Sequence, residues 1–338
     1  MRRIIVGFDG SAFATDALRW AVVEARRHGA DLVALTVLDD QPMPLQASTR
    51  QPPLDPRPDV LTGLRDAVQA AADGFPVVFR YTVGSAAAQL IAASRGADLL
   101  VVGSRGHGRL TNALLGSVSR ACLLHAPGPV AVIRPGATGA TDGRVVVGVD
   151  GSEPSRQAVR VAATEARLRR AALDTVHAVH WDRIGTELIT PTDEQLTEWG
   201  THLVHRQLAD LHQDLADAGV AARPVIVPGH PGDVLVDHSR TADLLVLGSR
   251  GHNPLASLLL GSTSDYCAHH ATCPVMVVRS EGKTPEETAA VGVAAEGTAA
   301  EGTAAEGTAA EGTAAEGTAA EETAPDRTAA ERPASAAW

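Results

Sequence analysis

The sequence predicts an α/β protein with two tandem domains, each a five-stranded parallel sheet with helices on both faces, followed by a disordered C-terminal tail. The chain has 338 residues, which is the usual length of two domains. Hydrophobic residues make up 44% of it but aromatic residues only 3%, which favours aliphatic cores of buried strands and helices. In addition, segments of the first half return in the same order in the second half.

The internal repeat defines the domain boundaries. "IIVGFDGS" at 4–11 returns as "VVVGVDGS" at 145–152, a shift of 141 residues. Later, "ADLLVVGSRGH" at 97–107 returns as "ADLLVLGSRGH" at 242–252, and "HAPGPVAVIR" at 125–134 as "HATCPVMVVR" at 270–279, both with a shift of 145. We therefore expect one domain at 1–138, a second at 143–281 and a tail at 282–338.

Within the first half, apolar runs alternate with helical stretches. The strands are expected at 4–8, 32–38, 77–83, 99–103 and 130–134, with helices near 13–28, 58–73, 86–95 and 112–125. This alternation is typical of parallel strands joined by right-handed helical crossovers. Ser11 and Ser152 follow Asp-Gly and precede helices, so they are expected N-caps. The proline-rich segment 41–58 is expected to be a loop.

The acidic charge lies mostly in the tail. The formal net charge is −11, but residues 281–338 hold 12 acidic against 3 basic residues, which leaves −2 for the rest. The "EGTAA" repeats from Glu296 carry almost no large apolar residue, so this segment cannot bury a core and is predicted to be disordered. A nearly neutral folded part does not favour nucleic acid as a partner.

Neither a membrane span nor a cysteine-based metal site is indicated. No apolar run approaches the ~20 residues that span a bilayer, and the N-terminus leads directly into a strand-like segment. We therefore expect a cytoplasmic protein without a membrane partner. Cys122, Cys267 and Cys273 form no CxxC pair, and the first two occupy equivalent positions on a core-facing helix. Small buried side chains are the expected role of the cysteines.

Two glycine-rich stretches carry the chemistry. "GSRGHGRLTNALLGSVS" at 103–119 and "GSRGHNPLASLLLGSTS" at 248–264 have glycines at identical intervals, each ending in Gly-Ser. Both follow a fourth strand, at the sheet edge where ligands of open α/β sheets bind. Glycines there permit positive φ and close approach to a ligand, and neighbouring N–H and hydroxyl groups can bind a phosphate chain. Alternatively, the glycines only permit tight turns and helix packing.

The spacing identifies a family. It is neither GxxxxGK[ST] nor GxGxxG, so the phosphate loop of the Walker type and the dinucleotide fingerprint are excluded. It resembles the universal stress protein family, whose ATP-binding members carry G-x2-G-x9-G-(S/T) after the fourth strand, and both halves match this motif. The resemblance implies the adenine nucleotide alpha-hydrolase-like fold and a regulatory stress-response protein that binds ATP, together with Mg²⁺.

The resemblance also implies site residues. In the first half, the phosphate and ribose side would be Gly103, Gly106, Gly116, Ser117 and Ser119, and the adenine side Asp9 and Val37. In the second half, the matching residues are Gly248, Gly251, Gly261, Ser262, Ser264, Asp150 and, in place of Val37, Ala178. His107 and His252 recur inside the loops as further phosphate candidates.

Two differences make the second site less complete. Ala178 gives a smaller adenine wall than Val37, and Asp265 places a carboxylate where the first half has Arg120. Asp9 and Asp150 have another role open to them, because an Asp before Gly-Ser can fix a turn by accepting backbone hydrogen bonds.

Binding rather than turnover is the expected output, since the loops offer no recognisable nucleophile, base and orienting partner. A slow ATPase or autophosphorylating activity and a nucleotide-free interaction scaffold remain alternatives. In the resembled family the fifth strand pairs with its counterpart in a second domain. The resemblance therefore implies that 130–134 and 275–279 run antiparallel in an intramolecular pseudo-dimer, with a homodimer of whole chains as a further option.

Overall fold

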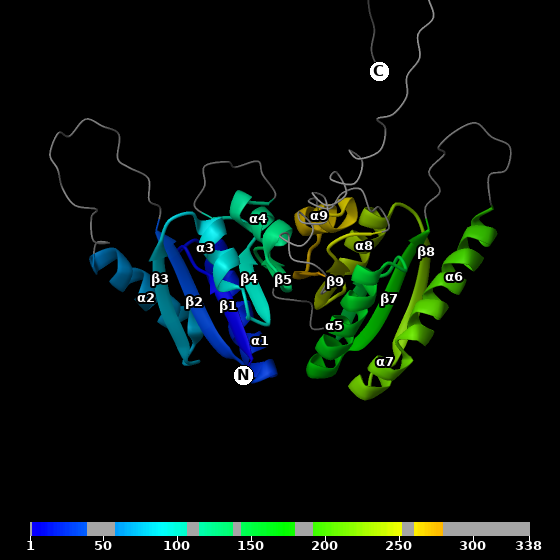
Figure 1. Cartoon of the computed structure of the whole chain (residues 1–338), viewed down its shortest axis with the longest axis horizontal. Helices are drawn as coiled ribbons and strands as arrows, with labels where there is room; N and C mark the ends of the chain where they lie inside the picture. The colour runs from blue at the N-terminus through cyan, green and yellow to red at the C-terminus, as the bar shows by residue number, and fades with distance from the viewer. Residues whose placement is uncertain are drawn as a thin grey trace, which may run out of the picture. The chain divides into compact units, whose positions relative to one another are not determined.

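The computed structural model describes residues 2–38, 58–106, 115–137, 143–179, 192–251 and 260–279 (Figure 1). The Pro-rich segment except Pro58, most of each glycine loop, the connection between the halves and the expected tail lie outside these residues. The expected α/β class is confirmed, because a mixed set of helices surrounds one large sheet.

The first half alternates strands and helices in the expected order. Its elements are β1 (Arg3–Gly7), α1 (Ala12–His28), β2 (Asp31–Leu38), α2 (Pro58–Ala72), β3 (Val77–Val83), α3 (Ala86–Ala93), β4 (Leu99–Gly103), α4 (Ser117–His125) and β5 (Val130–Ile133). The strands are parallel and ordered β3-β2-β1-β4-β5. The order reverses between β1 and β4, which places a binding crevice at their carboxyl ends.

The second half repeats this arrangement. Its elements are β6 (Arg144–Gly148), α5 (Glu153–Arg169), β7 (Ala172–Val179), α6 (Asp193–Asp210), α7 (His212–Ala218), β8 (Ala222–Pro228), α8 (Pro231–Ser239), β9 (Leu244–Gly248), α9 (Ser262–His270) and β10 (Val275–Val278). Here the order reverses between β6 and β9, and two helices, α6 and α7, take the place of α2. The second half thus has a crevice equivalent to the first.

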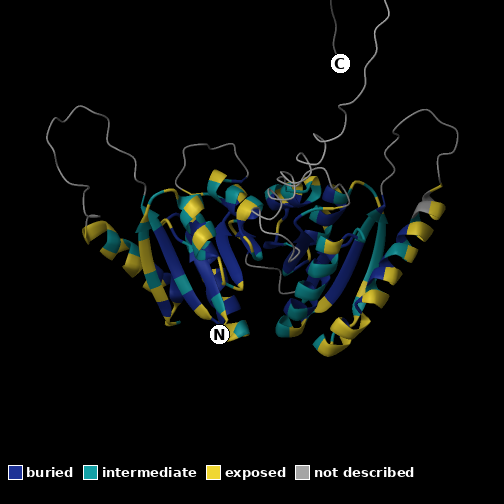
Figure 2. Ribbon diagram, in the orientation of Figure 1, coloured by how far each residue is buried: buried dark blue, intermediate teal, exposed yellow. Residues whose placement is uncertain are grey.

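The strands join in one sheet with the order β3-β2-β1-β4-β5-β10-β9-β6-β7-β8. β5 and β10 are antiparallel neighbours at its centre, with Val132 opposite Val275 and Ala131 opposite Met276. All four residues of each of these strands are buried (Figure 2). The apolar strands are therefore covered, and no bare edge is left at this point of the described sheet.

Both faces of the sheet carry a core because strand side chains alternate. Ile4 and Val6 belong to a core shared with α1 and α2, whereas Ile5 belongs to a core with α3 and α4. The long helices begin at the expected caps: Ser11 Oγ accepts a hydrogen bond from Ala14 N (3.1 Å) and Ser152 Oγ from Ser155 N (3.3 Å). No helix among the described residues is long and apolar enough to cross a membrane.

Candidate nucleotide site

The expected residues of the second half surround one cavity. It has a volume of about 470 Å³ and lies at the carboxyl ends of β6 and β9. Its lining includes all the residues expected in this half except His252: Asp150, Ala178, Gly248, Gly251, Gly261, Ser262 and Ser264. The volume is within the usual range of pockets for small ligands and cofactors, so the crevice can take a molecule of nucleotide size.

The first half places its expected residues at the ends of the equivalent elements. Asp9 lies just after β1, Gly103 ends β4, Gly116 is the N-cap of α4 and Ser117 is its first residue. Val37 lies near the end of β2 and is half-buried against the core that Ile5 forms with α3 and α4. His107 and its counterpart His252 lie outside the described residues, so their role stays a prediction.

Each Asp lies against a loop glycine. A Cβ on Gly106 would be 2.4 Å from Asp9 Oδ2, and one on Gly251 would be 2.6 Å from Asp150 Oδ2. Gly103 and Gly248 are equally restricted, because a Cβ there would lie 2.8 Å from backbone atoms of the first turn of α1 or α5. A larger residue would therefore meet the backbone at Gly103 or Gly248, and would push the Asp side chain aside at Gly106 or Gly251.

The expectation of positive φ in the loops is wrong for all six motif glycines, since none of them has a left-handed backbone. Positive φ is found instead at Gly10 and Gly151, at +84° and +86°, which turn the chain between each Asp and its N-cap serine. Close packing, rather than backbone freedom, is what requires glycine at four of the six motif positions.

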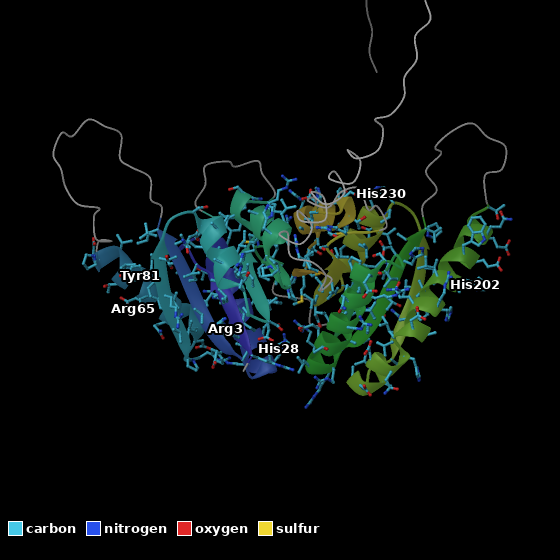
Figure 3. The ribbon with its side chains drawn as sticks, viewed as in Figure 1. Arg3, His28, Arg65, Tyr81, His202 and His230 are labelled. Atoms are coloured by element: carbon cyan, nitrogen blue, oxygen red, sulfur yellow. The ribbon has the colours of Figure 1, made fainter. Side chains whose placement is uncertain are left out.

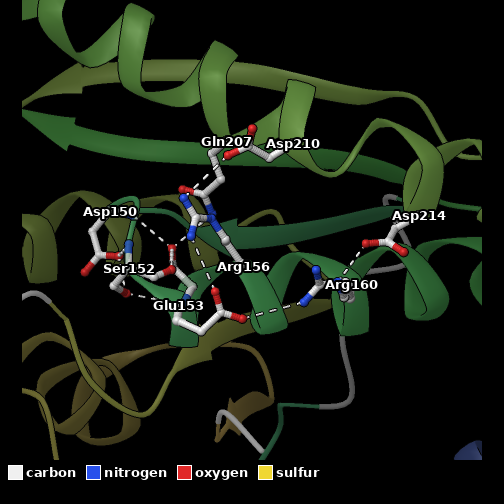
Figure 4. A network of polar contacts seen from close by, with 9 residues as sticks. Asp150, Ser152, Glu153, Arg156, Arg160, Gln207, Asp210 and Asp214 are labelled. Atoms are coloured by element: carbon white, nitrogen blue, oxygen red, sulfur yellow. Dashed lines mark hydrogen bonds and ion pairs between the residues drawn. The ribbon is translucent and has the colours of Figure 1, made fainter.

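The two Asp residues do fix their turns. Asp9 Oδ1 accepts from Ser11 N (2.9 Å), and Asp150 Oδ1 accepts from both Ser152 N (2.9 Å) and Ser152 Oγ (2.6 Å). Figure 4 shows the second of these turns in a polar network that continues through Ser155 to Gln207 on α6. One oxygen of each carboxylate thus holds the turn, while the other lies toward the glycine loop.

The third glycine of each motif is the N-cap of a helix. Gly116 precedes α4 and Gly261 precedes α9, and neither helix has a side-chain cap among the described residues. The first N–H groups of a helix lack intrahelical acceptors, and the helix dipole favours an anion there. Ser262 lines the cavity at this end. The arrangement is suited to bind phosphate.

Ser119 and Ser264 have a structural role that differs from the role of Ser117 and Ser262. Ser119 Oγ donates to Gly103 O (2.6 Å), and Ser264 Oγ donates to Gly248 O (2.6 Å). Both serines are buried. Their protons are therefore committed to the strand end, and they hold each helix N-terminus in place beside the loop.

Sequence reasoning missed a concentration of arginines beside the loops. Burial lowers the pKa of Arg134, and the charge of Arg105 lowers it further. The same two causes, burial and the charge of Arg250, lower the pKa of Arg279 in the second half. Arg250 also lines the cavity. Two positive charges close enough to repel each other favour a bound anion. The repeated "SRG" and the final Arg of each fifth-strand repeat were the available signals.

His177 was also missed, because His177 has no histidine equivalent in the first half. It lines the cavity next to Ala178, and its Nδ1 lies 2.7 Å from Val149 O. A carbonyl only accepts, so Nδ1 carries the proton. Thr36 takes this place in the first half, where Thr36 Oγ1 donates to Phe8 O (2.7 Å). The two sites therefore differ on the side expected to face a base.

Comparison with known proteins gives a consistent result. Residues 1–134 and 143–279 each match the universal stress protein family. A universal stress protein of Mycolicibacterium smegmatis is 34% identical over 290 residues, covering 82% of this chain and 96% of that protein. The crystal structure of a universal stress protein from Archaeoglobus fulgidus has a TM-score of 0.58 and 19% identity, and covers 83% of this chain and 98% of its own, which shows the shared fold. Another solved member, in complex with cAMP, is 29% identical, covers 40% of this chain and 95% of its own, and has a TM-score of 0.32.

Proposed function

Starting from the fact that the chain belongs to the universal stress protein family, we propose that it is a regulatory stress-response protein that binds ATP in each half. The observation that carries the proposal is the cavity of the second half, whose lining includes seven of the residues expected there. A site assembled from the ends of several parallel strands is where open α/β sheets bind ligands. We propose that the protein acts by binding ATP rather than by hydrolysing it, and that the ATP-bound chain is the signal.

The phosphates would lie at the helix N-termini. The uncapped N–H groups of α4 and α9, with the hydroxyls of Ser117 and Ser262, provide donors for phosphate oxygens. Arg105 and Arg250 add positive charge beside the loops. Mg²⁺ would bridge the phosphates, and the oxygen-rich lining from Asp150, Ser262 and Thr263 suits a hard cation.

The adenine would lie toward β2 and β7. Ala178 and His177 in the second half, and Val37 in the first, are placed to contact the base or ribose. The second carboxylate oxygen of Asp9 or Asp150 lies on the same side of each crevice, next to Gly106 or Gly251. The chemical difference between Thr36 and His177 leads us to propose unequal affinities for the two sites.

We further propose that domains 1–138 and 143–281 act as an intramolecular pseudo-dimer in the cytoplasm. The antiparallel register of β5 with β10 supports this, since it relates the two halves by an approximate two-fold axis. Cysteines replacing Ala131 and Met276, which face each other, should crosslink within one chain and migrate as a monomer in denaturing gels. A crosslink that joins two chains, or none, would contradict the intramolecular arrangement.

Nucleotide binding is tested with charged substitutions at the N-cap glycines. A Cβ on Gly116 or Gly261 would lie 3.3–3.4 Å from its nearest neighbours, so these positions tolerate a side chain better than the other motif glycines. Gly116→Asp and Gly261→Asp place a carboxylate against the phosphates. The purified double variant should lack the nucleotide that mass spectrometry detects in the purified wild type. In calorimetric titration with Mg²⁺–ATP, each single variant should bind about one equivalent less than the wild type.

The matched control is Gly63→Asp, which adds the same charge to an exposed glycine with no neighbour within 4 Å. It should bind ATP as the wild type does. Unchanged ATP affinity in the double variant would refute the proposed sites, and absence of ATP binding by the wild type would favour the scaffold alternative. A turnover assay on the same samples measures hydrolysis separately.

A further inference from the structure

A buried polar cluster lies where α1 and α5 meet, at the opposite end of the sheet from the glycine loops. Glu24 and His28 belong to the end of α1, and Glu165 and Arg169 to the end of α5. The repeat shift of 141 makes Glu24 equivalent to Glu165, and His28 to Arg169. Figure 3 shows His28 far from His230, which belongs to the loop end. The side chains of Glu24, Glu165 and His28 are 0%, 4% and 16% exposed.

Each carboxylate uses one oxygen for arginine. Glu24 Oε1 lies 2.7 Å from Arg27 Nη1 and 2.8 Å from Arg169 Nη2, and Glu165 Oε2 contacts Arg169 Nη1. The other oxygens face the imidazole: His28 Nε2 lies 3.0 Å from Glu165 Oε1 and 3.8 Å from Glu24 Oε2. Glu24 Oε2 is buried and accepts no hydrogen bond from any described residue. The arginines thus occupy only one oxygen of each carboxylate. The remaining atoms, Glu24 Oε2, Glu165 Oε1 and His28 Nε2, lie close together.

The environment of these atoms favours an additional positive charge. Two buried carboxylates, those of Glu24 and Glu165, lie close together here. Two helices also end here, and the partial negative charge of a helix C-terminus stabilises a cation. The buried oxygen of Glu24 therefore has no hydrogen-bond donor among the described residues, in a place where a cation could contact it.

We propose that Glu24 Oε2, Glu165 Oε1 and His28 Nε2 bind a divalent metal ion, with Zn²⁺ as the ion best suited to one imidazole and two carboxylates. All three atoms lie within 4.8 Å of one another. Bonds of about 2.0–2.2 Å in tetrahedral geometry place ligand atoms about 3.3–3.6 Å apart, and the distances of 3.0 and 3.8 Å bracket this separation. Only small side-chain shifts are needed.

The surroundings complete the site. A cavity of about 270 Å³ is lined by both His28 and Glu165, and it supplies an entry path and room for water as the fourth ligand. Arg27 and Arg169 hold the outer oxygens and so orient both carboxylates toward the ion. Because two ligands come from α1 and one from α5, the ion would fasten the two halves together independently of nucleotide.

The test is zinc titration of the full chain after treatment with a chelator. His28→Gln removes the nitrogen ligand but can still donate a hydrogen bond to Glu165, so its metal-free melting temperature should stay near that of the wild type. His202→Gln is the matched control, since His202 lies on α6 and its side chain is 74% exposed. We expect wild type and His202→Gln to bind zinc stoichiometrically and melt at a higher temperature with it, and His28→Gln to lose both effects.

A second measurement does not depend on the variants. In the wild type, zinc should shift the ¹⁵N resonance of His28 Nε2, because that atom becomes a ligand, and change Nδ1 much less. Equal zinc binding by His28→Gln, failure of the wild type to bind zinc, or an unchanged His28 Nε2 resonance at saturating zinc would each overturn the proposal.

Discussion

Arg120 and Asp265 occupy equivalent positions in the two halves, and in the folded chain they form an ion pair with each other. Arg120 Nε lies 3.5 Å from Asp265 Oδ1. The two residues belong to α4 and α9, the helices that begin at the N-cap glycines. The carboxylate that the sequence places near the second phosphate site therefore faces a positive charge from the first half, and it links the two proposed sites.

The first prediction concerns this pair. Arg120→Asp or Asp265→Arg alone would oppose like charges and should lower the free energy of unfolding by up to about 1 kcal/mol, a small value because both side chains are partly exposed (57% and 32%). The charge-exchanged double variant should recover most of the loss. Urea unfolding at low and high salt measures this, and additive losses in the double variant would show that the pair does not interact.

The second prediction concerns Gly251. In Gly251→Ala, the new Cβ would meet Asp150 Oδ2 at 2.6 Å, so Asp150 must move and disturb the turn at Ser152. We expect a loss of about 1–3 kcal/mol in urea unfolding. Adding Asp150→Ala should recover part of it. Gly63→Ala, at an exposed helical glycine, should instead stabilise by about 0.5–1 kcal/mol. A Gly251→Ala protein as stable as the wild type would contradict the packing argument.

The third prediction concerns the thiols. Cys122, Cys267 and Cys273 are buried, and burial raises the pKa of each to about 12. At pH 8 all three remain protonated thiols, which are poor nucleophiles. The native protein should therefore not react with an aromatic disulfide reagent on the timescale of minutes, and the denatured chain should release three equivalents. If one equivalent of thiol in the native protein reacted quickly with the reagent, one of the three cysteines would be accessible.

The fourth prediction concerns pH. Burial raises the pKa of Glu165, but contacts with His28 and Arg169 outweigh it, so its pKa lies below the ordinary 4.5. Such a group stabilises the fold above pH 4.5, and this contribution is lost as the pH falls through the folded pKa. With chelator present, Glu165→Gln should cost about 3 kcal/mol at pH 7. The difference should shrink below pH 4.5.

The control for this experiment is Glu153→Gln on the same helix, whose side chain is 55% exposed and whose effect should stay small at every pH. Part of the loss in Glu165→Gln will be offset, because Glu24 loses a like-charged neighbour. A difference from the wild type that is independent of pH would mean that the carboxylate charge of Glu165 does not contribute.

The sequence by itself determined the order of strands and helices along the chain, because the spacing of apolar residues and the helix caps are local properties. The expected strand at 77–83 coincides with β3, and the expected helix near 58–73 with α2. The repeat likewise pointed to two equivalent crevices, since residues that follow parallel strands meet at one sheet edge. It did not reveal α7, because the repeated segments lie on either side of that connection.

Contacts between distant residues were decided only by the tertiary structure. The approach of Asp150 to Gly251, the repulsion of Arg250 and Arg279, and the pairing of Arg120 with Asp265 join positions that no local period relates. The cluster of Glu24, His28 and Glu165 is the extreme case, since it exists only where two helix ends from different halves meet. Spacing along a chain specifies which face of an element a side chain occupies, whereas the packing of whole elements specifies which side chain it meets there.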